Sequence, residues 1–410
     1  MHLQFPSCAP PLPLPAFISK ISSDLTFLSL PPLPSPASSG VDVYGDFMSP
    51  KSDDANSYLR MFEKEVSTHL GMEDGVFMPS GVMAQSIVLK IAGERKGGGG
   101  GGDGGGEGVH VETSEFVCHE TSHILVHEKD SYSHLLNASP LMIESPDPMS
   151  PSSVSSKMSS SPSCVILEHP HRELGGAVNP HSDLGEIRDI CKSGGCHFHL
   201  DGARLWEATG AYGGKHSASD ICSHFDSVYV SFYKGLGGPA GAMLLGDRAF
   251  VEEARVWLRR FGGNLHTLAP LWVGCWAGYR RNVKAPGEGA GMTFADKASK
   301  LREVVRAIKG DDVAGRNVDF VPEVPEVCMV HVVINKEREI CERAERETFE
   351  KCGVHIFSRL RGAFRGDAGR TYFELNVGEG NGGVDTEVWR KAWRTFGEIA
   401  ERIQEEREGL

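Results

Sequence analysis

The sequence lacks an apolar run long enough to cross a membrane. None of its hydrophobic stretches reaches the roughly 18–20 residues that span a bilayer. It also lacks an excess of basic residues. It contains 42 lysines and arginines and 55 aspartates and glutamates, which give a formal net charge of −13. An acidic surface repels phosphate backbones and anionic lipid. We therefore expect neither a membrane nor a nucleic-acid partner.

A regular cysteine framework is also missing. The ten cysteines show no repeated spacing, and a chain of 410 residues can bury a core without disulfides. Cys191, Cys196, His197 and His199 come nearest to a metal cluster, but they lack the Cys-x-x-Cys spacing. We expect reduced thiols, a cytoplasmic location and no metal.

Three segments lack the periodicity of helices or strands. Residues 1–40 are rich in proline and serine, 97–108 are almost pure glycine, and 145–163 are mostly serine and proline. The glycine run lacks the Gly-Lys-Ser/Thr ending of a phosphate-binding loop, which favours an insertion. Prolines interrupt the apolar core that a secretory signal needs, so 1–40 is expected to be an irregular extension, with a poor organelle-targeting segment as the alternative.

Strand and helix patterns alternate between these segments. Such alternation predicts an α/β fold with a mostly parallel sheet covered on both faces. After about residue 293 the pattern changes to fewer, shorter strands and a long final helix. The sequence thus predicts a large domain over 41–292 and a small α+β domain over 293–410.

Two polar residues stand at the ends of predicted strands. Asp201 follows the apolar strand 196–200, and Lys234 follows the uncharged run Ser231-Phe232-Tyr233. Ligands of open α/β sheets bind outside the carboxyl ends of the strands. Alone, either residue would be an ordinary cap or surface group. A lysine after an uncharged strand, however, is partly desolvated, which lowers its pKa and favours imine chemistry.

Asp201, Lys234 and the nearby Arg204 together suit a pyridoxal phosphate site. The lysine can form a Schiff base with the aldehyde, the acid can keep the pyridine nitrogen protonated, and the arginine can bind a substrate carboxylate. We therefore predict pyridoxal 5′-phosphate as the cofactor.

A phosphate cradle is predicted where a strand leads into a helix at Ser80-Gly81-Val82. Backbone N–H groups at a helix start bind anions. An ordinary N-cap at Ser80 is the alternative. His123 precedes an apolar run and could stack on a cofactor ring, although a surface or core-edge histidine is the commoner case.

Several runs together resemble the threonine aldolase / aromatic amino acid β-eliminating lyase family of fold-type I pyridoxal phosphate enzymes. They occur in the order of that family, over about residues 41–263. They are Asp42-Val43-Tyr44-Gly45, Phe77-Met78-Pro79-Ser80-Gly81, Thr121-Ser122-His123-Ile124, Gly175-Gly176 with Asn179-Pro180, His199-Leu200-Asp201-Gly202-Ala203-Arg204 and Lys234-Gly235-Leu236-Gly237.

The resemblance implies a large domain with a mostly parallel seven-stranded sheet, a smaller C-terminal α+β domain, and a homodimer or homotetramer. It implies a role for each matching residue. Lys234 carries the cofactor, Asp201 pairs with its ring nitrogen, His123 stacks on the ring, Ser80, Gly81 and Val82 hold the phosphate, and Arg204 binds the amino-acid carboxylate.

Two departures from the family pattern affect the binding of the cofactor and of the substrate. Val82 stands where family members usually have threonine, which removes one hydroxyl contact to phosphate. Glu374 lies on the strand where a second carboxylate-binding arginine is expected. Arg361 and Arg370 are the candidates to replace that arginine.

The resemblance implies a lyase that cleaves a β-hydroxy-α-amino acid by retro-aldol chemistry. L-Threonine or L-allo-threonine would give glycine and acetaldehyde, a step of threonine catabolism and glycine biosynthesis. His123 is the nearest candidate for the general base. There are two alternatives. The first is another lyase or a transaminase on the same fold, and the second is a relative that binds the cofactor without catalysis.

Overall fold

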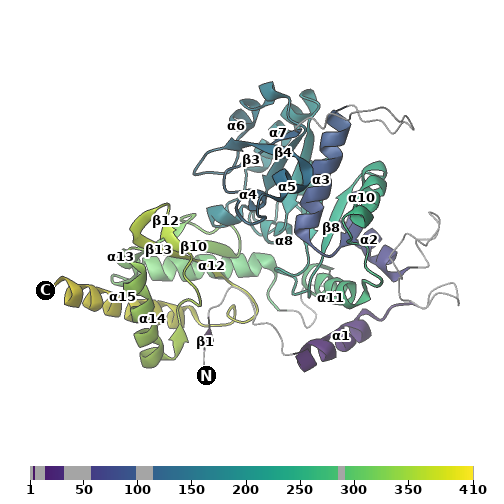
Figure 1. Cartoon of the computed structure of the whole chain (residues 1–410). Helices are drawn as coiled ribbons and strands as arrows, with labels where there is room; N and C mark the ends of the chain where they lie inside the picture. The colour runs from purple at the N-terminus through teal and green to yellow at the C-terminus, as the bar shows by residue number, and fades with distance from the viewer. Residues whose placement is uncertain (1–2, 5–13, 32–56, 98–113, 285–290, 410) are drawn as a thin grey trace.

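The fold is a large sheet domain followed by a smaller one, seen in a computed structural model that describes residues 3–4, 14–31, 57–97, 114–284 and 291–409 (Figure 1). The large sheet has seven strands in the order β2-β8-β7-β6-β5-β3-β4. Its strands are β2 (Asp74–Met78), β3 (Ser114–His119), β4 (Ala138–Ile143), β5 (Cys164–Glu168), β6 (His197–Gly202), β7 (Ser227–Ser231) and β8 (Ala242–Gly246).

All neighbouring strands of this sheet pair in parallel except β8, which is antiparallel to both β2 and β7. The predicted mostly parallel, seven-stranded sheet is therefore confirmed. One consequence matters for the site. The carboxyl ends of β2, β3, β5, β6 and β7 all lie at the same edge of the sheet.

Helices cover both faces of the large sheet, because a parallel sheet presents apolar side chains on each side. One face packs against α3 (Gly81–Lys96) and α10 (Arg248–Arg260). The other packs against α2 (Tyr58–His69), α7 (His181–Ser193) and α11 (Ala269–Tyr279).

Shorter helices connect these elements. They are α4 (His123–Val126), α5 (Ser131–Leu136), η4 (Arg172–Leu174), α8 (Leu205–Ala208), α9 (Ala218–Cys222) and η5 (Arg280–Lys284). Among the described residues, no helix combines the length and apolar character needed to cross a membrane.

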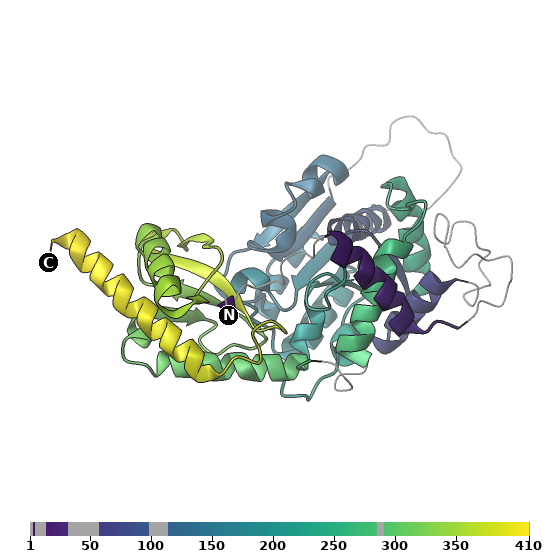
Figure 2. The same ribbon diagram turned by 90° about the horizontal axis from the view of Figure 1, so that it is seen from below.

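The small domain holds a four-stranded antiparallel sheet in the order β12-β13-β10-β9. Its elements are α12 (Phe294–Lys309), α13 (Ala314–Asn317), β9 (Val318–Val321), β10 (Met329–Ile334), α14 (Arg338–Cys352), β12 (Gly362–Phe364), β13 (Asp367–Asn376) and α15 (Thr386–Glu408). The long α15 runs along this domain beside α12 and α14 (Figure 2). A short β1 (Leu3–Gln4) pairs in parallel with β11 (Val354–His355).

The expectation of an irregular segment over residues 1–40 is wrong for part of its length. Helix α1 (Leu14–Leu28) packs against α11, and Leu28 is buried in the core of the large domain. After Pro15 the helix contains no proline, and its carboxylate Asp24 pairs with Lys20 at 2.6 Å and with Arg281 at 2.7 Å. Its contact with α11 and the ion pairs of the buried Asp24 explain why this stretch is ordered as a helix.

The serine- and proline-rich segment 145–163 is also more ordered than predicted. It contains α6 (Pro151–Ser155) and the 3-10 turn η3 (Met158–Ser160), and α6 packs against α7. Ser150 and Ser153 cap α6 reciprocally, each side chain bonding the backbone of the other. In the predicted glycine-rich insertion, residues 98–108 lie outside the described residues.

Candidate active site

Lys234 lies just past the carboxyl end of β7, in a tight turn. The N–H of Gly238 donates to the carbonyl of Phe232 at 2.7 Å, and Gly237 takes a φ of +69°, which a glycine adopts readily. Burial lowers the pKa of the Lys234 amine, Arg204 lowers it further, and Asp201 raises it. The turn thus brings the lysine into the electrostatic range of both other residues of the predicted triad.

Asp201 lies in β6, paired in register with Glu168 at the end of β5. Its side chain is buried, and among the described residues its carboxylate accepts one hydrogen bond, from the N–H of Ala203 at 3.1 Å. Burial and the neighbouring Glu168 raise the pKa of Asp201 to about 7, against the opposing effects of Lys234 and His123. The carboxylate is therefore buried, and no cation from the described part of the chain is in contact with it.

His123 begins α4, directly after β3. Its backbone N–H donates to Glu168 Oε2 at 3.0 Å, and its Nδ1 lies 2.9 Å from Glu128 Oε1. Burial opposes the charged ring, but Glu128 and then Asp201 raise the pKa of His123. Lys234 also acts on this ring, so the imidazole belongs to the same site.

The predicted phosphate cradle lies at the same edge of the sheet. Helix α3 begins at Gly81, Ser80 caps it by accepting from the N–H of Met83 at 3.3 Å, and Val82 is partly exposed. A Cβ on Gly81 would lie only 2.1 Å from the hydroxyl of Tyr229. The packing of Tyr229 therefore requires a glycine at position 81. The sequence suggested a different reason, the close approach of a ligand to the backbone.

Sequence reasoning missed three residues of this site, Glu168, His171 and Arg172. Glu168 accepts hydrogen bonds from the N–H groups of His123 and Arg172, both at 3.0 Å. His171 Nε2 lies 3.0 Å from the hydroxyl of Thr121 and 4.0 Å from Glu168. Glu168 ends a buried strand, so the signal used for Asp201 could have found it.

Three arginines surround Glu374 on β13, and we call Arg172, Arg204, Arg361 and Glu374 the Glu374 cluster. Arg204 Nη2 lies 3.1 Å from Oε1, Arg172 Nε lies 2.8 Å from Oε2, and Arg361 Nη1 lies 3.7 Å from Oε2. Although burial opposes ionisation, Arg204 and then Arg172 hold the pKa of Glu374 at about 2. The predicted carboxylate-binding residue Arg204 is therefore already paired with a carboxylate of the chain.

The two candidates for the second arginine lie in different places. Arg361 joins the cluster, although its shorter contacts are to Glu173, at 2.9 and 3.2 Å. Arg370 pairs with Asp319 at 3.0 Å and donates to Asn335, so its contacts lie within the small domain. Of the two, only Arg361 lies beside Glu374.

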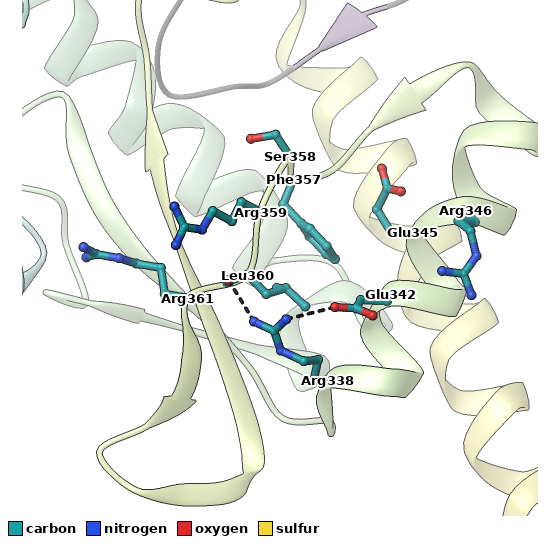
Figure 3. A pocket seen from close by; sticks show the side chains of 9 residues that line it. All are labelled: Arg338, Glu342, Glu345, Arg346, Phe357, Ser358, Arg359, Leu360 and Arg361. Carbon is teal, nitrogen blue, oxygen red and sulfur yellow. Dashed lines mark hydrogen bonds and ion pairs between the residues drawn. The ribbon is translucent and has the colours of Figure 1, made fainter.

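A hollow of about 460 Å³ lies in the small domain, and its lining includes Arg361 but neither Lys234, Asp201 nor His123. Its lining residues come from α14 and the segment that follows β11: Arg338, Glu342, Glu345, Arg346, Phe357, Ser358, Arg359, Leu360 and Arg361 (Figure 3). In Figure 3 the Arg361 side chain points away from Arg338 and Glu342. We therefore assign the candidate site by its chemistry and not by this hollow.

The residues at the sheet edge fit pyridoxal phosphate. Lys234 offers an amine whose pKa is lowered by burial, and Asp201 offers a buried carboxylate that contacts no cation among the residues the structure describes. The 16-residue helix α3 presents its N-terminus for an anion. This combination, on a mostly parallel sheet with a small C-terminal domain, has the architecture of the fold-type I class of pyridoxal phosphate enzymes.

The family model described as "Beta-eliminating lyase" matches residues 40–321, well over half of the sequence. The chain therefore belongs to the beta-eliminating lyase family. A solved structure of a protein from Listeria monocytogenes superposes on this chain with a TM-score of 0.78. The two are 28% identical, and the match covers 97% of this chain and 96% of that one. That protein is itself provisionally assigned as an L-allo-threonine aldolase.

Curated relatives match over shorter lengths. The low specificity L-threonine aldolase of Escherichia coli is 27% identical over 234 residues, 55% of this chain and 61% of the relative. Aldolase vrtJ of Penicillium aethiopicum is 44% identical over 102 residues, 25% of each protein. The chain thus covers from about a quarter to about three fifths of these relatives.

Proposed function

We propose that the protein is a pyridoxal phosphate-dependent lyase that cleaves a β-hydroxy-α-amino acid, L-threonine or L-allo-threonine, into glycine and acetaldehyde. The observation that carries this proposal is that Lys234 lies within electrostatic range of the buried carboxylate of Asp201 at one sheet edge, while among the described residues no cation is in direct contact with that carboxylate. The family and the aldolase relatives support the reaction class.

When bound, pyridoxal phosphate supplies an electron sink for the pair released at the α-carbon. Lys234 would hold the cofactor through its amine, and Asp201 would keep a proton on the ring nitrogen. The first turn of α3, from Ser80 to Val82, would bind the phosphate. The stacking of His123 on the ring, expected from the resemblance, remains part of this proposal.

His123 is the proposed base for the β-hydroxyl proton. Its Nδ1 lies 2.9 Å from Glu128, a group that accepts hydrogen bonds when ionised, so the neutral ring carries its proton on Nδ1. Nε2 is then the acceptor, and the raised pKa of His123 makes it a stronger one. Arg204 would bind the substrate carboxylate.

Replacing Lys234 tests the proposal directly. We expect Lys234→Ala to lose both the visible absorption band of the bound cofactor and the production of glycine and acetaldehyde from L-threonine. Lys192→Ala is the control, because Lys192 lies exposed in the last turn of α7 and should leave both signals unchanged. Full-rate cleavage by Lys234→Ala would show that the lysine is wrongly assigned.

The Glu374 cluster favours a second candidate, another lyase or a transaminase on the same fold. Its extra carboxylate changes the charge at the expected substrate-binding position. A panel of amino acids, assayed for glycine plus aldehyde and for pyruvate plus ammonia, separates the reactions. Protein that takes up the cofactor yet converts no amino acid would instead be a non-catalytic relative.

A further inference from the structure

Glu374 holds the position of a carboxylate ligand within the Glu374 cluster. Its Oε1 accepts from Arg204 at 3.1 Å and from the Asn376 amide at 3.0 Å, and its Oε2 accepts from Arg172 at 2.8 Å. The side chain is 9% exposed. Both oxygens are therefore filled by charged or polar donors, in the way that a bound α-carboxylate would be held.

The charge of Arg204 is balanced from within the chain. The Arg204 side chain is 12% exposed, its Nη2 lies on Glu374, and the buried Glu207 also acts on it. Arg172 likewise pairs with Glu374 and lies 3.7 Å from Glu173. An incoming amino acid thus meets guanidinium groups that already have partners.

Arg361 offers Glu374 an alternative partner. Its Nη1 lies 3.7 Å from Glu374 Oε2, too far for a strong hydrogen bond but within range after a small rotation of the carboxylate. Glu374 could therefore leave Arg204 without losing all of its ionic contacts, which keeps the cost of displacement low.

We propose that Glu374 occupies the carboxylate subsite of the ligand-free enzyme and competes with the substrate for Arg204, so that an amino acid binds Arg204 only by displacing Glu374 toward Arg361. This inference rests on the proposed function for the identity of the ligand, an α-amino acid. It adds that a side chain of the protein itself, Glu374, competes with that ligand for Arg204. Substrate binding is then weaker than Arg204 and Arg172 alone would allow.

The test is Glu374→Gln in the cofactor-loaded protein. The amide keeps the size of the side chain but removes the competing charge. We expect KM for L-threonine or L-allo-threonine to fall about tenfold with kcat within about twofold, because charge-assisted hydrogen bonds are about twice as strong as neutral ones. Asp319→Asn is the charge-matched control, since Asp319 pairs with Arg370 away from the cluster and should leave KM unchanged.

A binding measurement separates this inference from the proposed reaction. Glycine carries the α-carboxylate but no β-hydroxyl, so its stabilisation of the protein against heat reports the subsite without turnover. We expect half-maximal stabilisation of Glu374→Gln at about tenfold less glycine than for the original sequence. If neither protein cleaves an amino acid but this difference persists, the reaction is wrong and the subsite assignment holds.

Opposite results overturn the inference. Weaker glycine binding by Glu374→Gln would show that Glu374 positions Arg204 for the ligand, and unchanged binding would place the subsite elsewhere. Glu374→Asp guards against a folding failure, because it keeps the charge but shortens its reach by one methylene. Its KM should lie between those of Glu374→Gln and the original sequence, and a KM above the original would also contradict displacement.

Discussion

The ionised form of Asp201 destabilises the fold, although the proposed chemistry requires that form. A buried carboxylate costs free energy when ionised, and burial together with Glu168 raises the pKa of Asp201 to about 7 from an ordinary 3.8. The folded state therefore favours the protonated acid more than the unfolded state does. The stability contributed by that preference is complete below about pH 4 and is lost as the pH rises to about 7.

Asp201→Asn should therefore stabilise the cofactor-free protein in a pH-dependent way. We expect its free energy of unfolding at pH 8 to exceed that of the original sequence by roughly 2–4 kcal/mol, and the gain to shrink toward pH 5. Urea denaturation at the two pH values measures this. The variant should also lose cofactor-dependent activity. A loss of stability at pH 8 would mean that the carboxylate has a cationic partner.

Single residues differ in how far the sequence could place them. Asp201 and Lys234 could be placed because each follows an apolar strand, and parallel strands end at one sheet edge. Arg172 could not, because its contact with Glu374 joins positions 202 residues apart. Such a contact depends on how the two domains meet, and no local pattern reports that.

At the scale of elements, the start of α3 is held by packing against β7. Gly81 opens the helix, and a side chain there would collide with the buried Tyr229. We expect Gly81→Ala to lower the free energy of unfolding by about 1–3 kcal/mol, because overpacking forces side chains or backbone to move. It should also weaken cofactor binding, since the same turn forms the proposed cradle. Urea denaturation and cofactor titration measure the two effects.

Gly185→Ala is the matched control. Gly185 lies inside α7, and a Cβ there would meet its nearest neighbour, His224, at an ordinary 3.6 Å. Alanine is the better helix former by about 0.8–1 kcal/mol, so this variant should be somewhat more stable. If both variants were destabilised equally, general helix effects would explain the result better than the Tyr229 contact.

Helices and strands could be predicted where the local sequence pattern is enough to determine their type and approximate bounds. The predicted strand over 196–200 corresponds to β6 at His197–Gly202, and the helix predicted to start at Ser80-Gly81-Val82 is α3, which begins at Gly81. Helix α1 was missed because the prolines and serines of the surrounding segment 1–40 suggest irregular chain, while the helix packs against α11. Helix α6 was missed for a similar reason, since serine caps formed at Ser150 and Ser153 replace intrinsic helix propensity.

At the scale of the whole molecule, the candidate site draws on both domains. The large sheet has a core on each face, and the small domain has its own core around β10 and α15. Glu374 of β13 reaches across to Arg172 and Arg204. The sequence predicted the two domains because the strand pattern changes near residue 293. It could not predict this contact, which requires their relative placement.

The exposed Tyr233 beside Lys234 suggests a contact with a second chain. Tyr233 is 43% exposed although it directly precedes the partly buried Lys234, and its ring lies 5.9 Å from the Lys234 Nζ. A large aromatic side chain next to a reactive amine would be shielded from water by a second chain. We therefore propose, in line with the family resemblance, that the active form is a homodimer or homotetramer with Tyr233 in its interface.

Light scattering after size exclusion should give the mass of two or four chains of 44.5 kDa. Tyr233→Glu should shift this toward one chain and reduce activity, because a buried, unpaired charge at an interface is strongly unfavourable. Val256→Glu, at a similarly exposed position on α10, should leave the mass unchanged. A fully active single chain would contradict the proposed assembly, and dissociation by Val256→Glu alone would place the interface on the α10 face of the large domain.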